Sequence, residues 1–139
     1  MKISLFDVKD PANPLELSKI VKSKTYTPVE FNYKALTWLE TDGNYQFAFP
    51  TETWFEVPSS NSSSYWQAQT ALLLLETNSN SDVPSLGEVG TIKVDASSQV
   101  YVYVGDDRTI IHGDKIYYIH GNKVWLSDLQ APDITFGPY

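Results

Sequence analysis

The chain is dominated by short apolar runs that are rich in β-branched and aromatic residues, and turn-forming residues separate these runs. No long stretch combines apolar residues at helical spacing with helix caps. The pattern therefore predicts an all-β protein. The expected strands are residues 2–8, 15–22, 33–40, 45–51, 66–76, 86–94, 99–104, 108–112, 115–120 and 123–129.

The turn residues predict tight antiparallel hairpins. Asp42-Gly43 is the pair that a type I′ turn favours, whereas Gly113-Asp114 and Gly121-Asn122 place glycine first, as a type II′ turn prefers. Several strands are apolar on both faces: in residues 115–120, Ile116 and Tyr118 point one way while Tyr117 and Ile119 point the other. A sheet that is apolar on both faces must be covered on both faces, and other sheets are the expected cover.

A longer repeat accompanies these hairpins. The stretches "LFDVKDPANP", "LLLETNSNSDVP" and "WLSDLQAP" each place an acid (Asp7, Glu76 or Asp128) at the end of an apolar strand, and each then closes on proline. The acids are 69 and 52 residues apart, and a four-stranded blade takes about 40–50 residues. The longer interval contains a Ser-rich stretch, and residues 51–66 are expected to form a long loop insert with serine and aromatic residues.

These features predict one domain over residues 1–139, built from antiparallel four-stranded blades of a β-propeller. The chain has room for about three blades or part-blades, and closed propellers typically have about 4–8. We therefore expect a segment of a larger propeller, or self-association that completes the blades. A β-sandwich of similar strand content is the alternative.

The segment "KISLFDVKDPANPLELSKIV" resembles the blade edge of a family of secreted bacterial and archaeal β-propellers distantly related to WD40 repeats. "YTPVEFNYKALTWL" and "RTIIHGDKIYYIHGNKVWLSDL" resemble later segments of that family, with Asn32-Tyr33 standing where its pattern has an Asp-His pair. The resemblance implies a propeller in a secreted or cell-envelope protein, and it supplies no catalytic residues.

Charge and composition exclude several classes of function. The net charge is -7; residues 1–34 carry six lysines and four acids, and the acidic remainder repels the phosphates of nucleic acid. Without cysteine there are no disulfides and no Cys-ligated zinc. No apolar run reaches the roughly 18 residues that span a bilayer, and the apolar start is too short for a secretory signal. Because Met1 runs directly into a strand, we expect a chain cut from something longer.

The first candidate site is Asp7, Asp10 and Asn13, whose oxygens could bind calcium. Pro11 and Pro14 interrupt this segment, and no D-x-D-x-D-G loop is present. Asp and Asn followed by Pro are common turn formers, because their side chains bond to nearby backbone groups. We expect a turn here, with no metal site and no cofactor.

The remaining candidates are aromatic, acidic and histidine residues. The rings of Trp54, Phe55, Tyr65 and Trp66 could stack on sugars, anchor a protein partner, or pack the two ends of the insert against the core. Asp106, Asp107 and Asp114 could include a hydrolytic carboxylate pair, or form a solvated loop around Arg108. His112 and His120, at the hairpin ends, could act as ligands or bases, or bond to backbone. As ligand-binding candidates we select Trp54, Phe55, Tyr65, Trp66, Asp106, Asp107, His112 and His120.

The leading hypothesis is a non-catalytic binding or protein-interaction module, with no catalytic residues assigned and a protein or an extracellular polymer as its partner. The alternatives are a hydrolase or lyase acting on an extracellular polymer such as a glycan, and a purely structural propeller segment.

Overall fold

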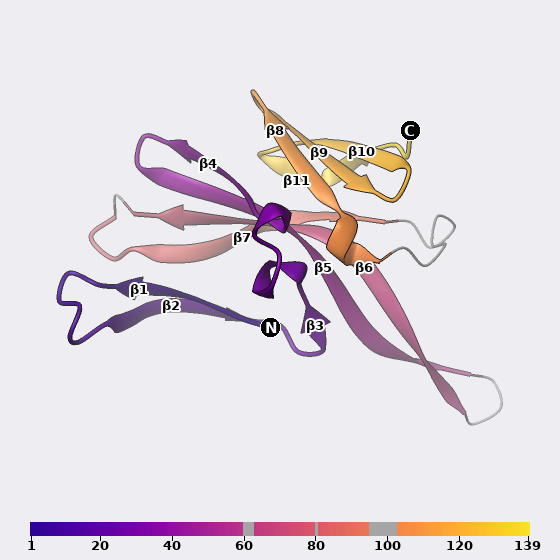
Figure 1. The fold of residues 1–139 in the computed structure, drawn as a ribbon, viewed down its shortest axis with the longest axis horizontal. Coiled ribbons are helices and arrows are strands. Elements are labelled where there is room, and N and C mark those ends of the chain that lie inside the picture. Colours follow the sequence, from indigo (N-terminus) through magenta and orange to yellow (C-terminus); the bar gives the residue numbers. More distant parts are fainter. Residues whose placement is uncertain (60–62, 80, 95–102) are drawn as a thin grey trace.

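The computed structural model describes residues 1–59, 63–79, 81–94 and 103–139. These residues form a two-stranded hairpin and two antiparallel sheets, with no α-helix among them (Figure 1). The all-β expectation is confirmed. In the described parts of the chain, no helix is long and apolar enough to cross a membrane.

The elements follow one another as meanders. The first hairpin consists of β1 (Lys2–Asp7) and β2 (Leu15–Val21). The middle sheet consists of β4 (Thr37–Thr41), β5 (Asn44–Pro58), β6 (Ser64–Asn78) and β7 (Ser85–Lys93), and the short β3 (Thr25–Tyr26) also pairs with β5. The C-terminal sheet consists of β8 (Arg108–His112), β9 (Lys115–His120), β10 (Lys123–Asp128) and β11 (Ala131–Phe136). In the described residues, the 3-10 helices η1 (Pro28–Glu30) and η2 (Tyr33–Ala35) lie between β3 and β4, and η4 (Val104–Asp106) precedes β8.

The predicted tight turns are confirmed. Asp42 and Gly43 both have positive φ, 51° and 78°, as a type I′ turn requires. Gly113 and Gly121 have φ of 62° and 60°, and the residues that follow them are not among those with positive φ, as in type II′ turns. The two-residue turn at Gly113-Asp114 pairs His112 with Lys115 and so fixes the register of β8 against β9.

Three sequence expectations differ from the structure. Residues 51–66 are not a long loop: β5 and β6 continue through residues 58 and 64, because Thr, Trp, Phe and Val at these positions favour extended backbone. The strand expected at 33–40 begins only at Thr37, because the Asn32 side chain accepts a bond from the Lys34 N–H and starts η2. The fourth strand of the C-terminal sheet, β11, was not expected. Most of the strand expected at 99–104 lies outside the described residues.

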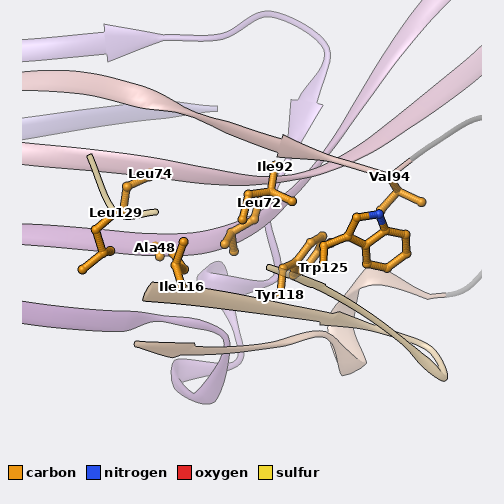
Figure 2. Packing of buried hydrophobic residues seen from close by; sticks show 9 residues of the cluster. All are labelled: Ala48, Leu72, Leu74, Ile92, Val94, Ile116, Tyr118, Trp125 and Leu129. Carbon is orange, nitrogen blue, oxygen red and sulfur yellow. The ribbon is translucent and has the colours of Figure 1, made fainter. Parts of the chain in front are cut away.

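The middle sheet is covered on both faces. On one face the cluster formed with the C-terminal sheet contains Leu72, Ile92, Tyr118 and Trp125 among other residues (Figure 2). On the other face, Phe49, Leu73 and Leu75 form a second cluster, against which Ile3 and Ile20 of the first hairpin pack. The first hairpin, the middle sheet and the C-terminal sheet therefore stack face to face.

Neighbouring sheets also contact each other at corresponding strands. At one edge of the two sheets lie β4 and β8, which are joined by the Thr37 hydroxyl donating to the Thr109 carbonyl at 3.0 Å. At the opposite edge lie β7 and β11, which are joined by the Thr91 N–H donating to Asp133 Oδ1 at 2.9 Å. A Cβ at Gly90 would lie 2.8 Å from Pro132 Cγ, so glycine permits this close approach.

Candidate binding surfaces

The most prominent candidate surface is the distal half of the β5–β6 hairpin, residues 54–58 and 64–68, which we call the arm. β3 pairs with β5 only as far as Thr53, followed by the Trp54 N–H donating to the Lys24 carbonyl at 2.9 Å, and β7 pairs with β6 only from Ala71. Beyond Trp54, the arm therefore extends past the neighbouring strands (Figure 1). It is a two-stranded ribbon whose connection is closed by the Ser59 N–H donating to the Ser63 carbonyl at 2.8 Å.

The arm brings together all four aromatic residues selected from the sequence. Trp54 pairs with Ala68 and Trp66 with Glu56, so the two indole rings share one face. Phe55 pairs with Gln67 and Tyr65 with Val57, so these two rings share the opposite face. All four are exposed, with fractions of 40% for Trp54, 38% for Phe55, 55% for Tyr65 and 52% for Trp66.

Two polar contacts position the indole face of the arm. The Trp54 Nε1–H donates to Glu52 Oε1 at 2.8 Å, and Glu52 is itself buried. The Lys24 ammonium lies 4.2 Å from the centroid of the Trp66 ring, a cation–π contact worth about 0.5–1 kcal/mol at an exposed site. The rings are thus held in place without being covered. That they bind a ligand stays a prediction.

The acidic and histidine candidates divide into a buried group and an exposed group. Asp107 is completely buried, so the expectation that it belongs to a solvated loop is wrong. It accepts a bond from the Tyr118 hydroxyl, and the His120 Nδ1 lies 2.8 and 2.9 Å from its two carboxylate oxygens. Asp106, His112 and Asp114 are exposed.

The buried group is part of the packing between strands. His120 is 4% exposed, and its ring and that of Tyr118 both lie about 6 Å from the Trp125 ring, at 6.3 and 6.1 Å between centroids. Burial, together with the charge of Asp107 and its bond to the hydroxyl, raises the pKa of Tyr118 well above its ordinary value. Because Asp107 and His120 are both sealed from solvent, this pair of residues gives no access to a substrate.

Asp7, Asp10 and Asn13 shape a turn, as the sequence predicts. The Asp7 carboxylate accepts from the Lys9 N–H at 2.9 Å, and the Asp10 carboxylate accepts from the Ala12 N–H and from the Asn13 amide at 3.1 and 2.8 Å. The Asn13 amide, followed by the Ala12 N–H, lowers the pKa of Asp10. The side chains therefore serve the β1–β2 connection.

Sequence reasoning missed an apolar groove between the first hairpin and the middle sheet. The groove has a volume of about 780 Å³, and its lining includes Leu5, Phe6, Leu36, Trp38, Tyr45 and Phe47. The Tyr45 ring lies 6.1 Å from that of Trp38 and 6.2 Å from that of Phe47, between centroids. Trp38 is 57% exposed, although it lies on a strand of a packed sheet.

The family model described as "Beta propeller domain" matches residues 1–131. No curated protein and no solved structure matches the chain.

Proposed function

Because the chain belongs to the β-propeller domain family, we propose that it is a non-catalytic protein-interaction module of a secreted or cell-envelope protein, and that the arm carries its contact surface. A binding or interaction role is general for propeller domains. The choice of a protein partner and of the arm is supported by the side chains that the arm exposes. The secreted or envelope location is supported only by the resemblance stated above.

The main support for this proposal is that the arm, which projects from the packed sheets, has exposed aromatic rings on both of its faces. Tyr and Trp are enriched at interfaces, because they bury a large area and keep a polar atom for a hydrogen bond. The two faces differ in chemistry: Glu52 and Glu56 flank the indole face, whereas Gln67 and Gln69 flank the other. A protein that grips the arm from both sides matches this arrangement better than a flat polymer on one face.

A catalytic role has less support. The closest acid–histidine pair, Asp107 and His120, is buried and engaged with Tyr118. A structural role as part of a larger propeller is the second candidate, and the apolar groove beside β1 favours it.

Site-specific photo-crosslinking tests the proposal. We would introduce a photo-reactive phenylalanine at Tyr65 on the arm and, as a control, at Tyr33, which is 80% exposed and lies away from the arm in η2. Irradiation of envelope and culture-medium fractions should give discrete protease-sensitive adducts from position 65 and none of the same size from position 33. Equal adducts at both positions, or adducts that resist protease and yield to glycosidase, would contradict a protein partner at the arm.

A further inference from the structure

The indole face of the arm continues onto a neighbouring strand. Tyr26 of β3 pairs with Glu52, which is two residues before Trp54 on β5, so all three side chains lie on the face that carries the two indole rings. Burial of Tyr26, followed by the adjoining Tyr103 hydroxyl, raises the pKa of Tyr26 to about 12. The charges of Glu30 and Glu52 act in the same direction, so both acids lie near this ring. The face is therefore lined by aromatic rings and bordered by carboxylates.

The carboxylates on this face have no counter-ion in the part of the chain that the structure describes. Glu52 is 8% exposed, and its side chain accepts a bond from the Trp54 Nε1–H. Glu56 is exposed and accepts from the Ser64 hydroxyl. Among the described residues, no lysine or arginine forms an ion pair with Glu30, Glu52 or Glu56. Because burying a carboxylate without a cation is costly, the face favours a positively charged ligand.

One cation of the chain itself already lies on this face. The Lys24 ammonium is centred 4.2 Å from the Trp66 ring, whereas no cation of the described residues lies over Trp54. Lys24 is held beside the arm through its carbonyl, which accepts from the Trp54 N–H. The face thus accommodates a cation over one ring, while the second ring and the carboxylates stay available to a ligand.

We propose that the indole face of the arm binds an extended segment of the protein partner that carries arginine at alternate positions. This assignment rests on the proposed function and names the chemistry that the partner brings to one face of the arm. The guanidinium groups stack on the indole rings and bond to Glu52 and Glu56. Charge complementarity supports this occupant, because residues 35–139 carry four basic residues and 13 acids.

Arginine matches this face better than lysine. A guanidinium stacks flat on a ring and donates in its own plane to a carboxylate, so one side chain can satisfy a ring and an acid together. Glu52 and Glu56 are four residues apart on β5, which separates their Cα atoms by about 13 Å. An extended segment has the same spacing between residues i and i+4. Its outer arginines therefore reach the two acids, and the arginine between them lies over the rings.

A synthetic peptide tests the proposal. The acetylated and amidated peptide RSRSR carries arginine at alternate positions, and the control peptide has neutral citrulline in place of every arginine. Each peptide is titrated calorimetrically into the full 139-residue chain at low ionic strength. RSRSR should bind saturably, and the citrulline peptide should bind about 10-fold more weakly or less. In NMR spectra the indole N–H signals of Trp54 and Trp66 should shift, whereas that of Trp38, on the opposite face of the middle sheet, should not.

Charge-neutral variants separate the face from the net charge of the chain. Glu52→Gln keeps a carbonyl oxygen as acceptor for the indole, and Glu56→Gln changes an exposed side chain; each should weaken RSRSR binding by about 5-fold or more. Glu76→Gln removes the same charge from an exposed position elsewhere on β6 and should change binding by less than about 2-fold. Lys24→Met removes the competing cation and should strengthen binding by about 3-fold, whereas Lys9→Met in the β1–β2 connection should not.

Several results would overturn the proposal. These are no saturable binding of RSRSR, equal affinity of the two peptides, or equal losses in Glu52→Gln, Glu56→Gln and Glu76→Gln. A gain in Lys24→Met no larger than that in Lys9→Met would overturn it too, because binding would then follow the net charge of the chain.

Crosslinking at Tyr65 distinguishes failure of this inference from failure of the proposed function, because Tyr65 lies on the opposite face of the arm. Discrete protease-sensitive adducts at Tyr65 without RSRSR binding would leave the proposed function standing and refute the basic segment. Binding of RSRSR to the indole face without such adducts would refute the protein partner at the arm, while the cation-binding face would stand.

Discussion

Replacing Asp107 by alanine should destabilise the protein more than any substitution of the exposed acids near it. Asp107 is completely buried and is bonded to both the Tyr118 hydroxyl and the His120 ring. Its removal leaves two buried polar groups without their partner. Each unsatisfied group costs about 1–3 kcal/mol, so we expect a loss of roughly 2–5 kcal/mol in the free energy of unfolding once partial relaxation is allowed for.

This loss is large against the roughly 5–15 kcal/mol that stabilises an ordinary domain. Urea unfolding followed by circular dichroism measures it, with the slope on urea concentration checked for two-state behaviour. Asp106→Ala is the matched control, because the neighbouring carboxylate is exposed and its removal should change stability by less than about 0.5 kcal/mol.

A double variant separates the hydrogen bonds from packing. If Tyr118→Phe accompanies Asp107→Ala, one of the two unsatisfied groups is gone, and the cost of the pair should be smaller than the sum of the single costs. Equal stabilities of Asp107→Ala and Asp106→Ala would refute the reasoning, since they would mean that the Asp107 carboxylate contributes no more than a solvated one.

Four further predictions concern alkaline stability, turns, metal and association. Burial raises the pKa of Tyr118 above its ordinary value of 10.0, so the stability that the neutral phenol contributes is fully present below pH 10 and is lost as pH rises toward the folded-state pKa. In a pH series, the urea midpoint should therefore fall less steeply above pH 10 in Tyr118→Phe than in the unaltered protein. Gly113→Ala should cost about 1 kcal/mol, because its φ is 62° and nothing lies near the added Cβ, whereas Gly87→Ala, also with open space and no positive φ, should not destabilise in the same urea assay. Calcium should not raise the melting temperature, although a native site at 100 times its Kd would add about 2.7 kcal/mol; an upward shift that Asp7→Ala abolishes would establish a site there. The chain alone should self-associate in light scattering over a concentration series, through β1 and residues 127–139; a monomer at high micromolar concentration would count against this.

Local signals in the sequence were sufficient for most of the fold. The turn glycines Gly43, Gly113 and Gly121 were sufficient to predict three hairpins. The repeat of an acid followed by proline located the turns between β1 and β2, between β6 and β7, and between β10 and β11. The position of the turn at Gly113-Asp114 was also sufficient to predict the Asp107–His120 pair, because counting back from this turn along both strands places the two residues opposite each other. Sequence-adjacent acids nevertheless suggested a solvated loop, because nothing local indicates that Asp107 turns inward.

The errors arose where local composition and tertiary pairing disagree. The Ser-rich tip of the β5–β6 hairpin made residues 51–66 look like a loop, yet the aromatic and β-branched residues on either side of it pair in register as far as Pro58 and Ser64. In β11, Pro132 weakens the strand pattern, but proline is compatible with an edge strand. The groove depends on how the hairpin stacks on the middle sheet, so no short stretch of sequence could predict it.

The same repeat register identifies an apolar face on the C-terminal sheet that no other described sheet covers. In the middle sheet, Leu72 and Leu74 turn toward the next sheet and are buried there. Their counterparts in the repeat, Val124 and Leu126, lie on the far face of the C-terminal sheet and are only partly buried. Across that face, Ile110, Tyr117, Leu126 and Phe136 form one cross-strand apolar row.

The two ends of this row are exposed, Ile110 by 51% and Phe136 by 52%, even though the row runs across all four strands. Equivalent apolar faces inside the molecule are covered by a sheet, and sheets of this kind pack about 10 Å apart with interdigitating side chains. The molecule therefore has two surfaces suited to β-structure, the groove beside β1 and the far face of the C-terminal sheet. The groove and the far face lie on opposite sides of the stack of sheets, so Trp38→Glu and Ile110→Glu should impair different associations.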